Sequence, residues 1–584
     1  SDIVAGYCGV FINRKVKPMN AFDQTSLFET FRNGTAEQLA GQLDILVQLL
    51  GERSFCRQAA THLVLFARPE NAIPGSLGRF APLVRDGIEF FLSGISYPRL
   101  RRVLLSQFLL RDCREPGERL LNLALHFPTL HKLGQVIARN PHLDPQLKRW
   151  LVGLEQGNYG TDPEVQVRFI RGQLASLGPH PEIVLVPRII AEASVATVLP
   201  FSCPTAGRGR PDQGVFKVLK PGVEDDLREE LEVMAGTFAF LEKDRERYGL
   251  EEMKLTGIFQ EIRGDMAREL DLSAEQEHLA EAVRVYEKVA GVRIPKPAPF
   301  STRAMTSMEY IDGRKIGDVP LTRHQRMVLA RLIFEAILCV PLFARQELAL
   351  FHGDPHAGNI LIVPGSDPKI FDVALLDWTL AGHLAKKQRG HVMELLLGVM
   401  KNDSWTLSGV IDSLALATAE KEGLNRSYLA ERIKMLLATK EYLACDPLQK
   451  SFLLLETMTL EGVVFPAELI LFRKSFFTLE GVLHDISPGF AMGEAMELYL
   501  GRLLLKELPQ RCGTWMTPAA DKSEHYQTLL SNRDLQELSL HQAIALWQQA
   551  MKRNTSLVET QMRVLTDLFR YFSGSHYWYG PRKR

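Results

Sequence analysis

The chain has 584 residues, 46% of them hydrophobic and 24% charged, and its formal net charge at pH 7 is zero. This length exceeds what one hydrophobic core can hold and predicts three or four compact units, at about 150 residues per domain. The balanced charge argues against nucleic acid as a partner. The seven cysteines are scattered without a CxxC pair, so neither a disulfide framework nor a zinc site is predicted, and a reducing, cytoplasmic compartment is favoured.

Residues 20 to about 155 are predicted to be helical, because apolar residues recur three and four positions apart. The clearest helical segments are 36–47, 85–94, 99–110 and 117–127. Proline and glycine mark the breaks between them.

Short β-branched runs then predict a small sheet. Its strands are expected at 183–186, 194–199, 214–219 and 303–311, with a long hairpin loop from Cys203 to Gly214. One long helical insertion, roughly 223–289, interrupts the sheet. From residue 321 the chain is predicted to be mostly helical outside 350–382, and 329–343 is expected to be a buried helix, because polar residues and a proline interrupt its apolar run.

The segment from Phe351 to Ile362 has the sequence FHGDPHAGNILI. An Asp followed five residues later by an Asn, just before an apolar strand, has the spacing of a kinase catalytic loop. Asp354 is therefore expected to orient or deprotonate the attacking hydroxyl. Asn359 is expected to offer its amide oxygen to Mg²⁺, which prefers hard oxygen ligands.

Asp377 closes a second apolar strand 23 residues after Asp354, where kinases carry the metal-binding Asp-Phe-Gly motif. The two motifs predict binding of ATP (or ADP) with Mg²⁺, the metal being held by Asn359 and Asp377. They do not separate protein kinases from small-molecule phosphotransferases, since aminoglycoside and choline kinases use a similar HGDxHxGN loop and often an Asp-Trp pair.

Four segments upstream of these motifs together indicate one family. They are HKLGQ at 131–135, AEASVATV at 191–198, VFKVLKPGV at 215–223 and RELDLSAE at 268–275. In this order they resemble the KxGQ motif, the Ala-rich loop, the ATP-binding lysine strand and the ExD motif of the UbiB family of atypical kinases and ATPases, the AarF domain-containing proteins. Segments 307–313 and 471–488 resemble the family's hinge and closing helix, so the resemblance covers roughly residues 120 to 495.

The resemblance implies roles for the charged residues of these segments. Lys217 is expected to bind the α- and β-phosphates and to need a carboxylate partner, with Glu275 the first choice and Glu269 the second. If both glutamates lay on one helix they would be about 120° apart, so we expect them to have different partners. The glutamate that does not pair with Lys217 is expected, with Asp271, to meet Lys132.

Further residues of the resemblance are expected to line the site. Lys132 and Gln135 share one helical face, and in the family this helix folds across the active site, which implies a small or lipid-like acceptor, or water. The expected nucleotide contacts come from the Ala-rich loop and the hinge: Ala193, Ser194, Val195, Ala196, Met308, Glu309 and Tyr310.

Two positions depart from the family pattern. Thr197 stands where the family has a glutamine, and Trp378-Thr379 replaces the Phe-Gly of the metal motif. Loss of that glycine removes a flexible position, so large flips of Asp377 are not expected. Because the lysine, Asp and Asn groups are retained, the sequence favours an active protein over a pseudokinase.

These observations predict an α+β, predominantly helical, protein-kinase-like two-lobed fold with an N-terminal helical extension and a helical C-terminal tail. The expected parts are an N-terminal helical region (1–118), the KxGQ extension (119–180), the N-lobe (181–312), the C-lobe (313–500) and the tail (501–584). The tail ends in an aromatic stretch and a basic terminus, for which packing onto the domain is preferred over contact with a membrane interface.

The leading hypothesis is a Mg-dependent ATPase or atypical kinase that supports isoprenoid-quinone (ubiquinone) or other lipid metabolism. A prenyl lipid or quinone precursor is then the expected ligand, and the expected location is the cytoplasm, free or peripheral at the inner face of a membrane. A small-molecule phosphotransferase and a nucleotide-regulated scaffold are the alternatives. The sequence does not predict the oligomeric state.

Overall fold

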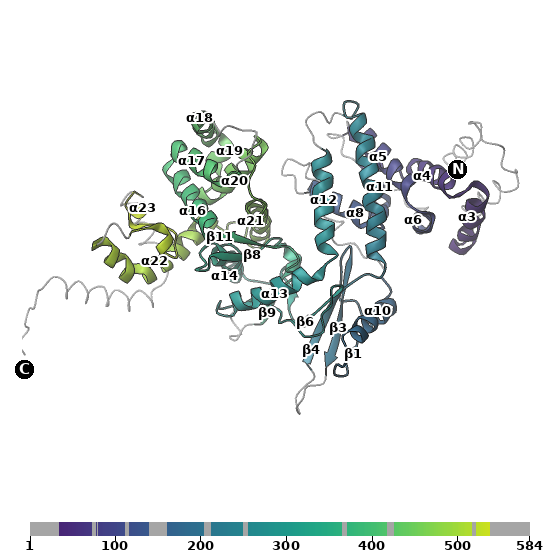
Figure 1. The fold of residues 1–584 in the computed structure, drawn as a ribbon, viewed down its shortest axis with the longest axis horizontal. Coiled ribbons are helices and arrows are strands. Elements are labelled where there is room, and N and C mark those ends of the chain that lie inside the picture. The colour runs from purple at the N-terminus through teal and green to yellow at the C-terminus, as the bar shows by residue number, and fades with distance from the viewer. Residues whose placement is uncertain are drawn as a thin grey trace, which may run out of the picture. The chain divides into compact units, whose positions relative to one another are not determined.

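The computed structural model describes residues 34–72, 78, 80–110, 116–138, 161–203, 212–248, 255–364, 371–416, 426–516 and 521–537. The chain forms two compact units (Figure 1). The first comprises residues 1–272 and 300–307, and the second comprises residues 273–299 and 308–584. Helices predominate and the sheets are small, which confirms the predicted fold class. The five predicted domain boundaries stay predictions.

The first unit begins with helices in the region where the sequence predicts them. They are α3 (Ala36–Leu50), α4 (Glu52–Ala67), α5 (Ala81–Gly94), α6 (Tyr97–Leu109), α7 (Pro116–Leu125) and α8 (Pro128–Ala138). Thr35 starts α3 with a capping box, since its hydroxyl accepts from the Gln38 amide while the Gln38 side chain accepts from the Thr35 amide. The helical periodicity of this region therefore predicts its structure well.

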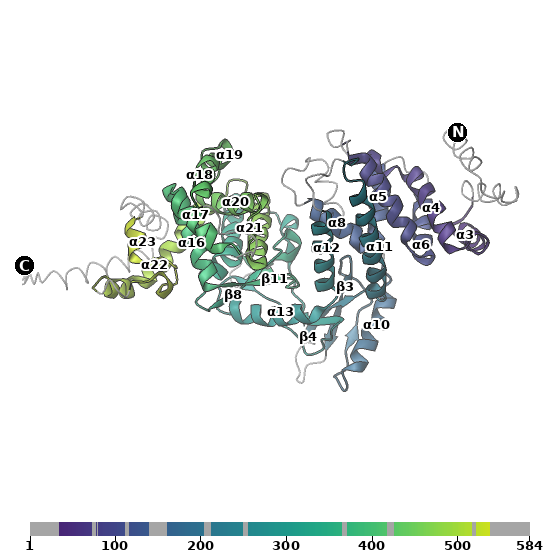
Figure 2. The same cartoon turned by 45° about the horizontal axis from the view of Figure 1, so that its top comes forward.

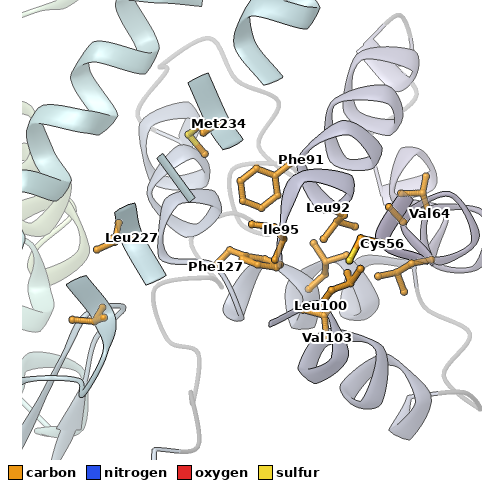
Figure 3. Packing of buried hydrophobic residues seen from close by; sticks show 14 of the residues in the cluster. Cys56, Val64, Phe91, Leu92, Ile95, Leu100, Val103, Phe127, Leu227 and Met234 are labelled. Carbon is orange, nitrogen blue, oxygen red and sulfur yellow. The ribbon is translucent and has the colours of Figure 1, made fainter. Parts of the chain in front are cut away.

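These N-terminal helices share one hydrophobic core with helices from further along the chain. Phe91 of α5, Ile95 just after that helix and Leu100 of α6 are buried in one cluster. Leu227 and Met234 of α11 (Val223–Lys243) belong to the same cluster (Figure 3). Helix α8 packs against both α11 and α12 (Leu255–Glu269), and Figure 2 shows the three together. The N-terminal helices are thus built into the unit that carries the Ala-rich loop.

The sheet of the first unit has the strand order β1-β3-β4-β6, with β2 paired to β3. The strands are β1 (Val184–Leu185), β2 (Ala191–Glu192), β3 (Ala196–Cys203), β4 (Asp212–Leu219) and β6 (Met305–Glu309). Strands β3 and β4 reach further into the predicted hairpin loop than expected, and residues 204–211 of that loop lie outside the described residues.

One face of this sheet packs on helix α10 (Pro163–Ser176). Leu199 and Phe216 are fully buried against Ile170 of that helix. Because side chains alternate across a strand, Lys217 lies on the opposite face from Phe216, and its register partner on β3 is Val198.

The expectation of one long helix between 223 and 289 is wrong. The chain forms α11, α12 and a third helix, α13 (Leu272–Tyr286). Helix α12 ends at Glu269, and the Leu272 amide donates to the Arg303 carbonyl at 3.0 Å instead of continuing the helical ladder. A hydrogen bond to a residue 31 positions away therefore ends a helix that local periodicity extends, and α13 falls in the second unit.

The second unit contains two small sheets. A four-stranded sheet has the order β5-β10-β9-β7, and a two-stranded sheet pairs β11 with β8. The strands are β5 (Val292–Arg293), β7 (Arg314–Lys315), β8 (Leu348–His352), β9 (Ile360–Pro364), β10 (Phe371–Leu375) and β11 (Ala381–Ala385).

Helices surround these sheets. They are α14 (Arg323–Phe334), α15 (Val340–Leu342), α16 (Lys386–Lys401), α17 (Ser404–Leu414), α18 (Arg426–Leu437), α19 (Lys440–Ala444), α20 (Pro447–Leu460), α21 (Ala467–Ile486), α22 (Met492–Met516) and α23 (Asn532–Glu537). Helix α21 confirms the predicted closing helix. None of the helices in the described ranges is both long enough and apolar enough to cross a membrane.

The predicted buried helix at 329–343 is confirmed, and it contains a turn of π-helix at Glu335–Cys339. The Val340 amide donates to the Glu335 carbonyl five residues earlier, which is the π-helical pattern. The next donor in this pattern would be residue 341, but Pro341 has no N–H to donate to the Ala336 carbonyl. The Ala336 carbonyl instead accepts a hydrogen bond from the Tyr286 hydroxyl of α13 at 2.9 Å. A proline thus creates a buried acceptor that anchors α13.

The C-terminal segment 521–537 is docked onto α22 by a buried ion pair. Arg511 and Glu507 of α22 pair at 2.7 Å, and Glu507 also accepts from the amide and hydroxyl of Thr528. Gln527 of the same segment donates to the Phe343 carbonyl at 3.0 Å. The aromatic stretch 569–580 and the basic terminus 581–584, on which the expected membrane or domain contact depends, lie outside the described residues.

Candidate functional site

The catalytic-loop sequence connects β8 to β9 in the second unit and is organised by the buried His352. Its Nε2 lies 2.9 Å from the Leu376 carbonyl, and its Nδ1 lies 3.2 Å from the Asp354 amide. Since the amide can only donate, Nδ1 is the acceptor and Nε2 carries the proton. Burial lowers the pKa of His352, which keeps the ring neutral in this arrangement. The histidine therefore fixes the backbone at both Asp354 and Leu376.

Asn359 closes the loop. Its side-chain nitrogen donates to the Asp354 carbonyl at 3.2 Å, and its backbone carbonyl accepts from the Leu376 amide at 2.8 Å. The first bond sets the orientation of the amide, so that its oxygen points away from the loop backbone. The second bond joins the loop to the residue just before Asp377. The structure thus brings the segments of Asp354, Asn359 and Asp377 together within one unit.

Asp377 has a left-handed backbone conformation, with φ of 53°. This is uncommon for a residue with a side chain, and such conformations are concentrated at functional sites. Its Oδ1 accepts from the Thr379 amide at 3.2 Å and from the Thr379 hydroxyl at 2.6 Å. Thr379, which the sequence presents only as the loss of a glycine, therefore holds the carboxylate in place.

Trp378 is fully buried and packs between two aromatic rings. Its ring centroid lies 4.9 Å from that of His352 and 5.9 Å from that of Tyr286. The carbonyl of Trp378 lies 3.2 Å from Nδ1 of His278 on α13. Together with the threonine bonds, this packing gives a physical basis for the expectation that Asp377 does not flip.

Helix α13 contacts the metal-motif segment at more than one point. Besides His278, Glu281 of α13 lies 2.9 Å from His383 of β11. Glu275, the predicted first-choice partner of Lys217, is buried on this helix. His278 and Glu281 could not be predicted as site residues, because neither belongs to a spaced motif and their partners are about 100 residues away.

In the first unit, the Ala-rich loop forms a tight turn between β2 and β3. The Ala193 amide donates to the Ala196 carbonyl at 2.8 Å, and the Lys220 amide donates to the Val195 carbonyl at 2.9 Å. Glu192 and Lys220 form an ion pair at 3.1 Å beside this turn. The expected nucleotide contacts at 193–196 are therefore held by backbone hydrogen bonds.

Lys217 is half-buried on β4 of the first unit. Its two predicted carboxylate partners, Glu269 and Glu275, lie in different surroundings. Glu269 is paired with Lys132, with Nζ 2.5 Å from Oε1, whereas Glu275 lies in the second unit. The pairing of Lys217 with Glu275 stays a prediction.

Glu269, Asp271 and Glu275 do not lie on one helix, so the 120° argument does not apply. Glu269 is the last residue of α12, Asp271 is in the connection, and Glu275 is on α13. Asp271, which was expected near Lys132, has Arg303 as a partner at 3.4 Å. The expectation of different partners for the two glutamates remains compatible with these positions.

The remaining expected residues lie at the predicted elements. Gln135 is on α8, three residues after Lys132. Met308 is buried in β6, Tyr310 follows the strand, and Glu309 is paired with Arg293 at 3.0 Å. Thr197 is fully buried on β3, on the face that packs against α10, so it faces away from Lys217.

The donor groups of the second unit suit a hard cation. The oxygens of Asp377 and Asn359 are the ligand type that Mg²⁺ prefers, and Mg²⁺ usually takes only one or two protein ligands beside phosphate oxygens and water. Within the described ranges, no group of three or more His, Cys, Asp or Glu side chains is placed to hold a metal. The site therefore fits a metal that arrives with a phosphate ligand better than a closed protein cage.

The chain is similar in sequence to known proteins. Residues 185–410 match the family model described as the ABC1 atypical kinase-like domain. An uncharacterized chloroplastic aarF domain-containing protein kinase of Arabidopsis thaliana is 29% identical over 311 residues, which cover 51% of this chain and 53% of that protein. A probable protein kinase UbiB of Xanthomonas axonopodis pv. citri is 24% identical over 412 residues, covering 65% of this chain and 69% of that protein.

Two further proteins are similar to this chain. The chloroplastic protein ACTIVITY OF BC1 COMPLEX KINASE 7 of Arabidopsis thaliana is 24% identical over 398 residues, covering 66% of this chain and 54% of that protein. The chain thus spans about half the length of both Arabidopsis relatives. Among solved structures, the complex of Rv3197 with erythromycin from Mycobacterium tuberculosis matches with a TM-score of 0.36 and 17% identity, over 57% of this chain and 86% of that chain.

Proposed function

This chain belongs to the ABC1/UbiB family of atypical kinase-like proteins, and we propose that it binds ATP with Mg²⁺ and hydrolyses ATP or transfers its γ-phosphate. The observation that carries the proposal is the geometry around Asp377. A carboxylate in a strained left-handed conformation follows a residue that is hydrogen-bonded to the Asn of a kinase-type loop. Backbone strain of this kind is maintained only where the surroundings enforce it, and the Thr379 and Trp378 contacts do so.

Each polar group of the site has a proposed role. Asp377 and the amide oxygen of Asn359 hold the metal, which supplies charge neutralisation for the phosphates when bound. Asp354 accepts a proton from, or orients, the attacking hydroxyl or water. His352, kept neutral by burial, holds the loop in position. Lys217 contacts the phosphates, and Glu275 is its proposed carboxylate partner because Glu269 is engaged by Lys132.

The finer function is proposed from the UbiB resemblance. It implies a small or lipid-like acceptor, or water, and a role in isoprenoid-quinone or other lipid metabolism. Peripheral contact with a membrane and a cytoplasmic location belong to the same proposal. The half-buried pair between Lys132 and Glu269 supports the family resemblance from which this proposal is drawn, because it fastens the KxGQ helix to the helix of the ExD motif.

The test is an ATPase assay with and without anionic or prenyl-lipid micelles. Wild type is compared with Asp354→Asn, Asp377→Asn and Lys132→Ala, and with Asp412→Asn, an exposed aspartate of α17, as the matched control. We expect Mg-dependent hydrolysis in wild type and in the control. In Asp354→Asn and Asp377→Asn we expect the rate of hydrolysis to fall about 100-fold or more, as for removal of a key electrostatic group.

Different outcomes separate the alternatives. Nucleotide binding without turnover, even with lipid, would favour a scaffold. Turnover that Lys132→Ala leaves unchanged, with and without lipid, would favour a small-molecule phosphotransferase. Absence of both binding and hydrolysis in the presence of Mg²⁺ contradicts the proposal.

A further inference from the structure

A buried ion pair in the first unit joins α6, which lies outside the kinase-like match, to α11, which lies inside it. Arg99 of α6 contacts the Glu230 carboxylate of α11, and their side chains are 6% and 0% exposed. The guanidinium also donates to the Asp226 carbonyl at 2.8 Å and lies over the Phe127 ring, 5.2 Å from its centroid. A charge pair buried this deeply costs desolvation energy, so removing one partner alone leaves an uncompensated charge.

Glu230 also accepts hydrogen bonds from the start of α8. Its Oε2 accepts from the Thr129 amide at 2.9 Å and from the Thr129 hydroxyl at 2.7 Å. Thr129 is fully buried in the first turn of α8, where backbone amides lack helical partners and the helix dipole favours a negative charge. The carboxylate of α11 therefore caps α8 from outside, and Arg99 holds that carboxylate.

Helix α8 carries Lys132 only three residues beyond Thr129. Lys132 pairs with Glu269 of α12 at 2.5 Å, so α8 is also fastened to the ExD motif helix. Phe127, just before α8, is buried among the core residues shared by α5, α6 and α11 (Figure 3). The start of α8 is thus fixed by the N-terminal helices, and its next turn presents Lys132.

We propose that Arg99, Glu230 and Thr129 are positioning residues through which the N-terminal helices set the Lys132–Glu269 pair. This rests on the proposed function, in which that pair belongs to the site. The matched domain, residues 185–410, contains Glu230 on α11, whereas α6 and α8 precede it in the chain. The consequence is that a change in α6 alters the chemistry of Lys132 without touching it.

The experiment measures the reactivity of Lys132 with an amine-modifying reagent, acetic anhydride, by mass spectrometry of the full chain. Thr129→Val removes the buried hydroxyl at constant shape, and Thr129→Ser restores it. Lys220 is the internal control, because its pair with Glu192 lies in the same unit and has matching exposure, 16% and 11% against 12% and 22% for Lys132 and Glu269.

We expect Thr129→Val to raise the labelling of Lys132 roughly tenfold, as for loss of one buried hydrogen bond, and Thr129→Ser to return it to the wild-type value. Labelling of Lys220 is expected to stay constant. Arg99→Met, if it folds, is expected to have the same selective effect. Equal increases at both lysines, or no increase at Lys132, overturn the inference.

Hydrolysis provides a second, independent measurement. If Thr129 acts through Lys132, the double variant Thr129→Val/Lys132→Ala has the turnover of Lys132→Ala alone, since the two changes are not additive. Full additivity contradicts the inference. Absence of turnover in wild type contradicts the proposed function but leaves the labelling result decisive for the positioning role.

Discussion

His126, in the connection between α7 and α8, makes stability of the first unit depend on pH. Its Nε2 lies 2.8 Å from the Ser106 hydroxyl, and burial, with smaller effects of the Arg102 and Arg99 charges, lowers the pKa of His126 from 6.5 to about 4. The unfolded chain therefore binds more protons than the folded chain between these values. The neutral ring's contribution is fully present above pH 6.5 and is lost as the pH falls toward 4.

The magnitude follows from the two pKa values. The pKa of His126 differs by about 2.5 between the unfolded and folded chain, which corresponds to about 3 kcal/mol of folding stability. About 2 kcal/mol of this stability is lost between pH 7.5 and pH 5. The control variant is His126→Gln, which keeps a polar side chain but cannot be protonated.

Hydrogen exchange of the α7 amides measures the free energy of opening in this part of the first unit. At pH 7.5 we expect the free energy of opening to be higher in wild type than in His126→Gln. At pH 5 we expect this difference, the gap between the two proteins, to be smaller by about 2 kcal/mol. The other histidines are common to both proteins, so their titration cancels in the comparison. A gap that is the same at both pH values refutes the assignment of a buried neutral His126.

Three substitutions in the second unit test the packing around the proposed site, each by the urea midpoint of that unit. Trp378→Phe is expected to lower the unfolding free energy by about 1–2 kcal/mol, because it leaves a void beside His352; an unchanged midpoint argues against tight packing there. Arg389→Met is expected to cost about 3 kcal/mol, since the fully buried guanidinium donates to the carbonyls of the loop before β8; a cost below about 0.5 kcal/mol contradicts this. Gly382→Ala is expected to cost about 1–3 kcal/mol, because the added methyl group meets the buried Phe351 ring at 2.6 Å; a neutral result shows that the ring yields.

Local patterns predicted the elements that local interactions determine. Helical periodicity placed α3, α5, α6 and α7, and motif spacing placed Asp354, Asn359 and the strand after them. The break at residue 270 was missed because a backbone bond from Leu272 to Arg303 ends the helix, and no pattern within 223–289 encodes that bond. The π turn near Pro341 was also missed, although the proline itself was the signal.

The sequence indicates which residues are candidate metal ligands, but it does not reveal the contacts that hold them in place. Asp377 could be assigned from its distance to Asp354, whereas the role of Thr379 depends on a backbone conformation that the sequence does not reveal. Lys132 was expected to meet Asp271 together with the glutamate that does not pair with Lys217; in the structure Glu269 pairs with Lys132, and Asp271 has Arg303 as a partner. Arg99 and Glu230 are 131 residues apart and belong to no motif.

Calorimetric titration of ATP with and without MgCl₂, using wild type and Asp377→Asn, tests whether Asp377 holds a metal that accompanies the nucleotide. We predict that wild type binds ATP more tightly with Mg²⁺, and that the substitution abolishes this Mg²⁺-dependent gain while leaving the fold intact by circular dichroism. Binding that is independent of Mg²⁺ in wild type, or an undiminished Mg²⁺ effect in the variant, would contradict this prediction.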